Sequence, residues 1–177
     1  MTTWVQTVDA AGLSGGLLVG RLVIGLGIAA HGAQKLFGWF GGHGLAGTGG
    51  YFESLGFRPG RLFATLAGLG EFVSGLLIVL GLFGPIGPAL LLAVMLVAMG
   101  QNMKNGFFAM NQGIELPLLY GAAGVALAFT GPGAYSLDAA LGLGELSSPD
   151  IGAVALIVGI LGALAAQLVR HPAPAAR

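Results

Sequence analysis

The chain has 177 residues, of which 55% are hydrophobic and only 8% are charged, and its formal net charge is zero. An ordinary soluble domain carries about 25% charged residues, so this composition excludes a water-soluble globule, and the high hydrophobicity excludes a disordered chain. The composition therefore predicts an all-α integral membrane protein. The absence of cysteine excludes disulfides and iron–sulfur ligation by thiolates, and without a basic cluster nucleic acid is not an expected partner.

Five apolar stretches follow one another along the chain. The predicted membrane-spanning helices cover residues 13–30, 61–83, 86–101, 114–130 and 151–169, and the first is expected to continue helically through 31–37. About 20 residues cross a hydrocarbon core of about 30 Å, so the third and fourth stretches are short. The residues before the first stretch contain Asp9 and no lysine or arginine, so we expect no cleaved secretory signal.

The connections between these stretches divide the chain into three parts. A glycine- and aromatic-rich loop covers residues 38–61, a tight turn at 81–88 makes the second and third stretches antiparallel neighbours, and a polar linker covers 134–150. We predict a four-helix membrane domain over 1–142, a linker and a fifth spanning helix over 143–170, and a disordered tail over 171–177.

The charges outside the spans predict the orientation. Alternate connections place six cations on one side of the membrane: Lys35, Arg58, Arg61, Lys104, Arg170 and Arg177. The opposite side receives only acidic residues: Asp9, Asp138, Glu145 and Asp150. The positive-inside rule then predicts a cytoplasmic membrane protein with its N-terminus outside and its C-terminus in the cytoplasm.

Ionisable residues also lie within the spans or at their rims, namely Arg21, His31, Lys35, Glu71 and Glu115. A charge at mid-helix costs at least about 2.5–3.5 kcal/mol in a bilayer and normally faces a partner in the bundle interior. If His31 and Arg61 lie at one depth, then Arg21 and Glu71, each about 15 Å further in, meet near the membrane centre. Small residues flank Glu71, so we predict a buried Arg21–Glu71 ion pair.

His31, Lys35 and Glu115 are predicted to form a second polar cluster at the cytoplasmic rim. His31 lies about 40° from Lys35 around the first helix, and Glu115 begins the fourth stretch at the same depth. Two interpretations remain open. In one, the ion pairs are structural and set the helix register; in the other, the polar groups line a pocket for an anionic or quinone-like ligand, or a proton path.

Aromatic residues gather at the same predicted rim: Phe37, Trp39, Phe40, Tyr51, Phe52, Phe107 and Phe108. They are typical of an interfacial belt, and the alternative is a hydrophobic mouth for a membrane-dissolved substrate. The sequence contains no phosphate-binding glycine loop, hydrolase triad or metal-ligand cluster, so we predict no metal site and assign no catalytic residue.

Several of the polar residues lie in short motifs along the chain. These are Arg21 with His31-Gly32 and residues 35–38, then Gly70-Glu71, then residues 106–108 and 115–117, and finally residues 131–133 and 136–138. With these motifs, residues 16–142 resemble the DoxX family of small membrane proteins. The resemblance implies a four-helix bundle. Some members of that family are membrane subunits of thiosulfate:quinone oxidoreductases, and others are linked to quinone or oxidative-stress handling.

The chain departs from the family pattern after residue 142, where a linker and an apparent fifth span follow. We therefore predict a transmembrane helix bundle with a four-helix DoxX-like core and a fifth, C-terminal transmembrane helix. The resemblance implies an integral membrane subunit associated with quinone-linked redox processes, with no electron carrier of its own and with a bound quinone as its cofactor. The expected partners are the lipid bilayer and a membrane protein or a second copy. The alternative is a non-catalytic structural or assembly subunit that docks through the extra helix.

Overall fold

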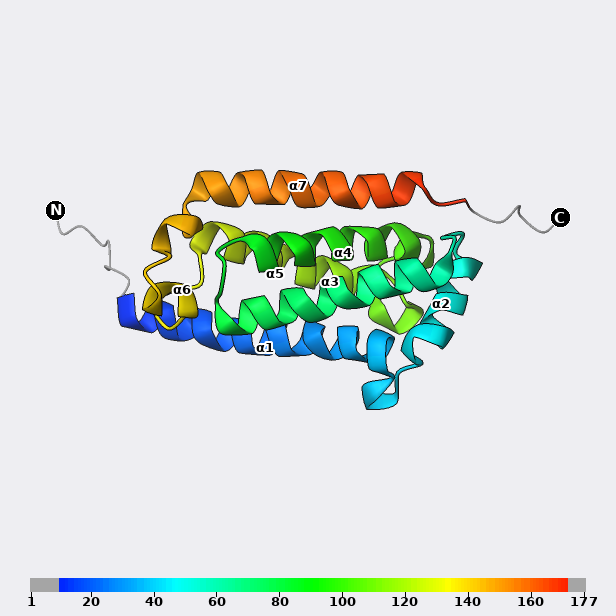
Figure 1. Ribbon diagram of the computed structural model, residues 1–177, viewed down its shortest axis with the longest axis horizontal. Helices are drawn as coiled ribbons and strands as arrows, with labels where there is room; N and C mark the ends of the chain where they lie inside the picture. Colours follow the sequence, from blue (N-terminus) through cyan, green and yellow to red (C-terminus); the bar gives the residue numbers. More distant parts are fainter. Residues whose placement is uncertain (1–9, 172–177) are drawn as a thin grey trace.

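The computed structural model describes residues 10–171 as a set of helices joined by short connections (Figure 1). The α-helices are α1 (Ala10–Phe37), α2 (Gly44–Ser54), α3 (Gly60–Leu80), α4 (Ile86–Asn102), α5 (Glu115–Thr130), α6 (Leu137–Ala140) and α7 (Pro149–Leu168). Short 3-10 helices cover Trp39–Gly41, Met103–Asn105, Ala109–Asn111 and Gly144–Ser147.

The long helices α1, α3, α4, α5 and α7 run along one axis, with α2 at one end and α6 at the other (Figure 1). Among the described residues, four segments are long and apolar enough to cross a membrane: α1, α3, Ile86–Asn105 and α7. The predicted all-helical membrane bundle is confirmed. α5 has 16 residues, or about 24 Å, so its crossing of the membrane stays a prediction.

Glycines bring the backbones of α1 and α3 into contact. A Cβ atom on Gly32 would lie 2.5 Å from the amide nitrogen of Phe72, and one on Gly75 would lie 2.5 Å from the carbonyl oxygen of Gly25. A Cβ on Gly32 would also lie 2.7 Å from the carbonyl oxygen of Gly68. Such close approach is typical of small residues at helix interfaces in membranes. These contacts set the register of the antiparallel pair: Gly25 faces Gly75, and Gly32 faces Gly68.

This register shows that the predicted Arg21–Glu71 pair is wrong. With Gly25 opposite Gly75, Arg21 lies opposite about residue 79 of α3, roughly eight residues or 12 Å from Glu71. The prediction failed because it placed His31 and Arg61 at the same depth. α3 instead begins beyond the end of α1, and α2 packs against that extra length.

Two clusters of buried apolar side chains form the core. One consists of Ile28, Ile78, Leu91 and Met95, and the other of Leu92, Ala128 and Leu156. The outward faces also carry large apolar side chains, such as Val23 of α1 and Leu161 of α7, which are more than half exposed. An apolar exterior of this extent suits acyl chains rather than water.

α7 packs against α4 and α5 and reaches the connection between α2 and α3. A Cβ on Gly159 would lie 2.7 Å from the carbonyl oxygen of Ala89, so α7 approaches α4 closely. Beyond α7, Arg170 Nε donates to the Leu55 carbonyl at 2.6 Å, and the His171 amide donates to the Gly56 carbonyl at 2.8 Å. His171 is thus held by the fold; the rest of the predicted disordered tail, 172–177, lies outside the described residues.

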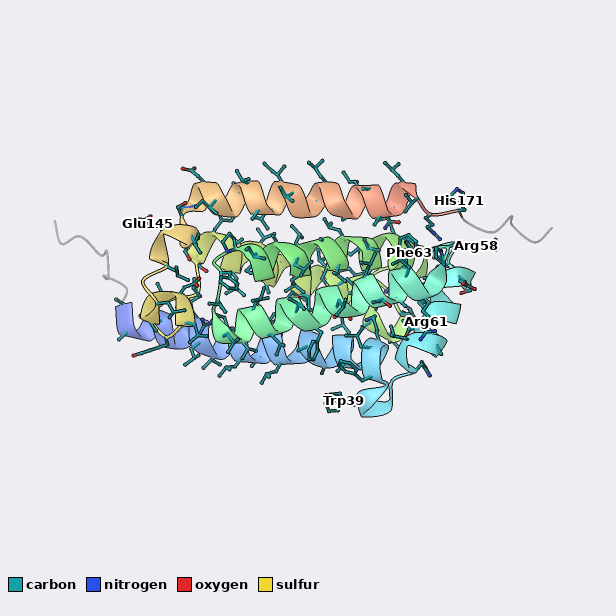
Figure 2. The ribbon with its side chains drawn as sticks, viewed as in Figure 1. Trp39, Arg58, Arg61, Phe63, Glu145 and His171 are labelled. Atoms are coloured by element: carbon teal, nitrogen blue, oxygen red, sulfur yellow. The ribbon has the colours of Figure 1, made fainter. Side chains whose placement is uncertain are left out.

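Several basic side chains lie at one end of the bundle. Arg58, Arg61 and His171 lie at the end where α2 is found, and Glu145 lies at the opposite end (Figure 2). Arg21 is a cation in the half of the bundle near Glu145, but its side chain is buried. Arg58, Arg61 and Arg170 therefore share one end, together with the acidic Glu53, whose Oε1 accepts from the Gly60 amide at 3.2 Å. Arg177 and Asp9, which belong to the same prediction, lie outside the described residues.

Candidate functional site

An ion pair between α1 and α3 lies at the centre of the candidate site. Lys35 Nζ donates to Glu71 Oε2 at 2.5 Å, and the side chains are 27% and 6% exposed, respectively. Gly68, one turn before Glu71, makes room for the lysine, because a Cβ there would lie 3.3 Å from Lys35 Cβ. Lys35 is two residues from the end of α1, so its stem extends inward to reach the carboxylate.

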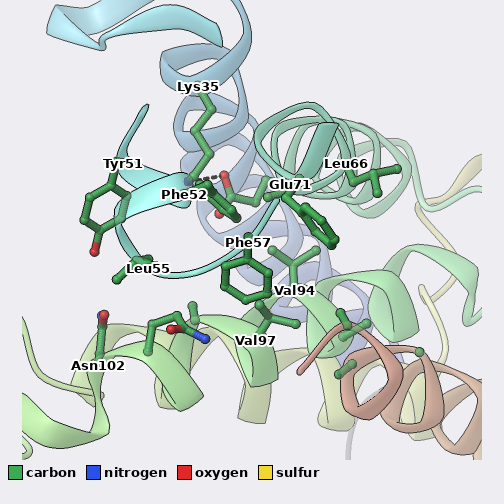
Figure 3. A pocket seen from close by; sticks show the side chains of 18 residues that line it. Lys35, Tyr51, Phe52, Leu55, Phe57, Leu66, Glu71, Val94, Val97 and Asn102 are labelled. Atoms are coloured by element: carbon green, nitrogen blue, oxygen red, sulfur yellow. Dashed lines mark hydrogen bonds and ion pairs between the residues drawn. The ribbon is translucent and has the colours of Figure 1, made fainter. Parts of the chain in front are cut away.

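The ion pair forms part of the wall of a cavity of about 340 Å³, which we call the Lys35 cavity (Figure 3). Its lining comes from α1, α2, α3, α4 and α7 and from the connection between α2 and α3. Four lining residues have charged or amide side chains: Lys35, Glu71, Gln101 and Asn102. Four are aromatic: Tyr51, Phe52, Phe57 and Phe63. The cavity is therefore apolar over most of its surface and polar at a few places.

Gln101 places an unused acceptor in the wall of this cavity, where the oxygen atom is itself buried. Its side chain is buried, and its Nε2 donates to Gln167 Oε1 of α7 at 3.0 Å. Gln167 Nε2 in turn donates to the Val97 carbonyl at 3.2 Å. Gln101 Oε1 has no hydrogen-bond partner within the described part of the chain. An unpaired buried acceptor costs about 1–3 kcal/mol, so a ligand or water that donates a hydrogen bond there would be favoured.

Glu115 does not join His31 and Lys35, which lie one turn apart on α1, so the predicted three-residue rim cluster is wrong. His31 is exposed, and its ring stands edge-on to Tyr120 of α5, with the centroids 6.2 Å apart. Glu115 Oε2 accepts a hydrogen bond from the Ala109 amide at 2.8 Å, which holds the connection before α5. Neither residue lines the Lys35 cavity, because each is turned toward α5 or its preceding connection.

Arg21 belongs to a different polar cluster, at the other end of the bundle. Its side chain is buried, and its Nη2 donates to the Tyr135 carbonyl at 2.5 Å. Asp138, also buried, accepts hydrogen bonds from the amides of Phe83 at 2.8 Å and Gly84 at 2.6 Å. The cluster thus joins α1 to the turn between α3 and α4 and to the segment before α6. The sequence reasoning missed the part played by Asp138, although its acidic side chain was assigned to this end.

Two nitrogens of Arg21, Nε and Nη1, have no hydrogen-bond partner among the described residues. A small void of about 10 Å³ adjoins the side chain, which is about the space that one water molecule needs. This space is too small for an organic ligand, so the Arg21 cluster has a structural character and the Lys35 cavity is the better candidate site.

The aromatic residues predicted at the rim divide into two groups. Tyr51 and Phe52 line the Lys35 cavity. The others lie outside its lining and are about half exposed or more: Phe37, Trp39, Phe40, Phe107 and Phe108. The aromatic residues thus do not form one group, and the belt and the hydrophobic mouth both stay predictions. Phe57 and Phe63 line the cavity but were not singled out in the sequence, because a single phenylalanine in an apolar segment carries no distinguishing signal.

No group of three or more histidine, aspartate or glutamate side chains that could hold a metal ion occurs among residues 10–171. A family model described as DoxX matches residues 16–110, which is more than half of the chain. The matched segment contains most of α1 and all of α2, α3 and α4, with both Lys35 and Glu71, and it ends in the connection before α5. No curated protein and no solved structure matches the chain.

Proposed function

The chain belongs to the DoxX family, and from this premise we propose that it binds a quinone or a similar ring compound within the bilayer, as a membrane subunit that works with a redox partner. The observation that carries the proposal is the Lys35–Glu71 ion pair in the wall of an apolar, aromatic cavity. Charged groups at membrane depth are costly, and they commonly mark substrate or proton pathways.

The Lys35 cavity has a suitable size and lining for a ring. Its volume of about 340 Å³ falls within the range of about 300–1,000 Å³ for small-molecule sites. Phe52, Phe57 and Phe63 provide apolar faces against which a planar ring can pack. Figure 3 shows Phe52 and Phe57 beside the ion pair, so a ring that contacts them also comes near its polar groups.

The polar groups of the cavity match the oxygen atoms of a quinone. An ammonium group has three N–H donors, and Lys35 uses one of them on Glu71, so two remain for a ring carbonyl oxygen. Glu71 directs the ammonium and balances its charge, so a neutral ring meets a wall with no net charge. Gln101 Oε1 can accept a hydrogen bond from the hydroxyl of a reduced ring. The bound quinone would supply two-electron, two-proton chemistry, with electrons from the partner.

A binding measurement with matched variants tests the proposal. Wild-type protein in phosphatidylcholine nanodiscs is equilibrated with menadione, and the bound quinone is extracted and quantified. Loss of a hydrogen bond from a charged donor costs about 1.5–3 kcal/mol, so Lys35→Met should bind about ten- to a hundredfold more weakly. The double variant Lys35→Met/Glu71→Gln, which leaves no buried charge, should be similarly weak. The matched control is Lys104→Met, because Lys104 is exposed and lies outside the cavity lining.

Two results would contradict this function. Either wild-type protein binds no menadione, or both Lys35 variants bind it as well as Lys104→Met does. The second candidate function, a non-catalytic assembly subunit, would then take precedence. It is favoured by the position of α7 at the edge of the bundle (Figure 1), where Val154, Val158 and Leu161 are left exposed by the rest of the described chain.

We also propose the cytoplasmic membrane as the location, with the cation-bearing end of the bundle in the cytoplasm. The grouping of Arg58, Arg61 and Arg170 at this end supports the orientation through the positive-inside rule. α1 would then begin outside and α7 would end in the cytoplasm. The Lys35 cavity would lie in the cytoplasmic half of the bilayer, where a cytoplasmic donor or acceptor of electrons could approach it.

A further inference from the structure

The Lys35 cavity extends from the bundle interior to the outer surface of α3. Glu71 and Leu66 both line it, and five residues of helix separate them by about 140°. Glu71 is buried, whereas Leu66 is 56% exposed. In Figure 3, Leu66 lies on the side of the cavity away from Tyr51 and the α2 end. The cavity therefore reaches the outer surface of α3 at Leu66, and we call this edge its lateral rim.

α7 forms the opposite side of this lateral rim. Gly162, Ala163 and Ala166 line the cavity, and Gly162 is exposed, with nothing within 4 Å of a Cβ built on it. α3 and α7 both pack against α4. Val94 and Val97 of α4 line the cavity between them. The gap between α3 and α7 thus has a floor from α4 and small residues along its α7 edge.

The gap lies at the depth of the ion pair. α4 and α7 run parallel, with Gly159 beside Ala89 and Gln167 bonded to Val97, so Gly162 lies level with residues 92–94 of α4. On the other side, a Cβ on Gly70 would lie 2.6 Å from Val94 Cγ2, and Gly70 directly precedes Glu71. A ring held by Lys35 therefore faces a lateral gap at its own depth in the membrane.

The chemistry of the gap favours a hydrocarbon chain. Its edges are formed by apolar or small residues, Leu66, Gly162, Ala163 and Ala166, and apolar residues such as Leu69 and Val158 are exposed on the adjoining faces. A water-soluble solute gains nothing from such a path. An alkyl or isoprenoid chain can lie in it and continue into the lipid, which is equally apolar.

We infer that the cavity opens sideways into the bilayer between α3 and α7, and that its ligand is a lipid with an uncharged ring head and a long hydrocarbon chain that leaves through this gap. The inference rests on the proposed function for the ring and adds a separate claim about the chain. α7 lies beyond the segment that matches the family model, so the α7 side of the gap is a feature of this protein's C-terminal part.

The test fills the gap without disturbing the packing. Gly162→Phe places an aromatic ring in open space, and removing a helical glycine raises helix propensity. Gly20→Phe is the matched control, because Gly20 of α1 is exposed and also has nothing within 4 Å of a built Cβ. Each protein in phosphatidylcholine nanodiscs is tested with menadione and with menaquinone-4, which has the same ring and a long isoprenoid chain. Leu66→Trp provides a second obstruction, from the α3 side.

We expect Gly162→Phe and Leu66→Trp to weaken menaquinone-4 binding at least tenfold more than they weaken menadione binding, with Gly20→Phe like wild type for both quinones. If both obstructed variants bind menaquinone-4 as wild type does, the lateral opening is refuted while the proposed function stands. If they lose both quinones equally, the substitutions act on the ring site and the inference also fails. If wild type binds neither quinone, the proposed function fails instead.

Discussion

Removing Lys35 should destabilise the protein much more than removing Glu71, although the two residues form one ion pair. Glu71 has a side chain that is 6% exposed and lies eleven residues into α3, or about 16 Å from its start. Lys35 is 27% exposed and two residues from the end of α1. Its flexible stem can carry the ammonium to water at the bundle end when the carboxylate is absent. Glu71 has no such route.

The expected magnitudes follow from this asymmetry. Lys35→Met leaves a buried carboxylate without its partner, which costs about 3–5 kcal/mol. Glu71→Gln leaves a lysine that reaches solvent, so the loss should resemble that of an exposed pair, about 1 kcal/mol or less. In a protein of this size, 1 kcal/mol shifts Tm by about 2–4 °C. Lys35→Met should therefore lower Tm by about 6–20 °C, and Glu71→Gln by about 4 °C at most.

The assay should not depend on thiol dyes, because the chain has no cysteine. A C-terminal green fluorescent protein fusion is heated in detergent, and the folded fraction is read by size-exclusion chromatography. The double variant Lys35→Met/Glu71→Gln should return to within a few degrees of Glu71→Gln, and Lys104→Met should match wild type. Equal losses in the two single variants, or a double variant as unstable as Lys35→Met, would refute the reasoning.

Three further predictions concern the rest of the bundle. A reporter fused after the last residue should report a cytoplasmic location, and a reporter inserted at residue 142 should report an external one. If both reporters lie on the same side, the five-span topology is contradicted. Gly81→Ala should lower Tm, because Gly81 has a φ of 61°, and this conformation costs other residues about 1–2 kcal/mol. The added Cβ would also overlap the Arg21 guanidinium. The control Gly20→Ala adds its Cβ in open space and should leave Tm unchanged. Asp138→Asn should lower the free energy of unfolding by about 1.5–3 kcal/mol, because it weakens the hydrogen bonds to two backbone amides. Asp150 is exposed, so Asp150→Asn should leave Tm unchanged.

The long helices could be predicted from the sequence because the solvent leaves few alternatives. An apolar run in lipid must satisfy its backbone hydrogen bonds internally, and the predicted stretches 61–83, 86–101 and 114–130 correspond to α3, α4 and α5. α2 was predicted as a loop, since four of its eleven residues are glycine and glycine disfavours helix. Its helix is supported by tertiary packing, with Gly49 against Arg61 and Gly60, which local propensity does not report.

Lys35 and Glu71 were each singled out in the sequence, but they were not paired with each other. Pairing depends on the relative depth of two helices, and the loop between them does not determine that depth. A usable signal was nevertheless present, because Gly25 and Gly32 in the first span have the same seven-residue spacing as Gly68 and Gly75 in the second. Matching these glycines in an antiparallel pair places Arg21 opposite about residue 79 and Lys35 opposite about residue 65, so Lys35 lies about 9 Å along the helix from Glu71, a distance that its stem can span.

The boundary of the family match runs between the ion pair and the α7 side of the lateral gap. Lys35 and Glu71 lie within residues 16–110, whereas the glycine and alanines of α7 that border the lateral gap lie beyond it. If the ring is held at the ion pair and the chain in the lateral gap, substitutions at these two places should differ in kind. Lys35→Met should weaken binding of the ring with or without a chain, whereas Gly162→Phe should discriminate between the two ligands. A cavity whose ion pair and lateral opening are separate places predicts both patterns together.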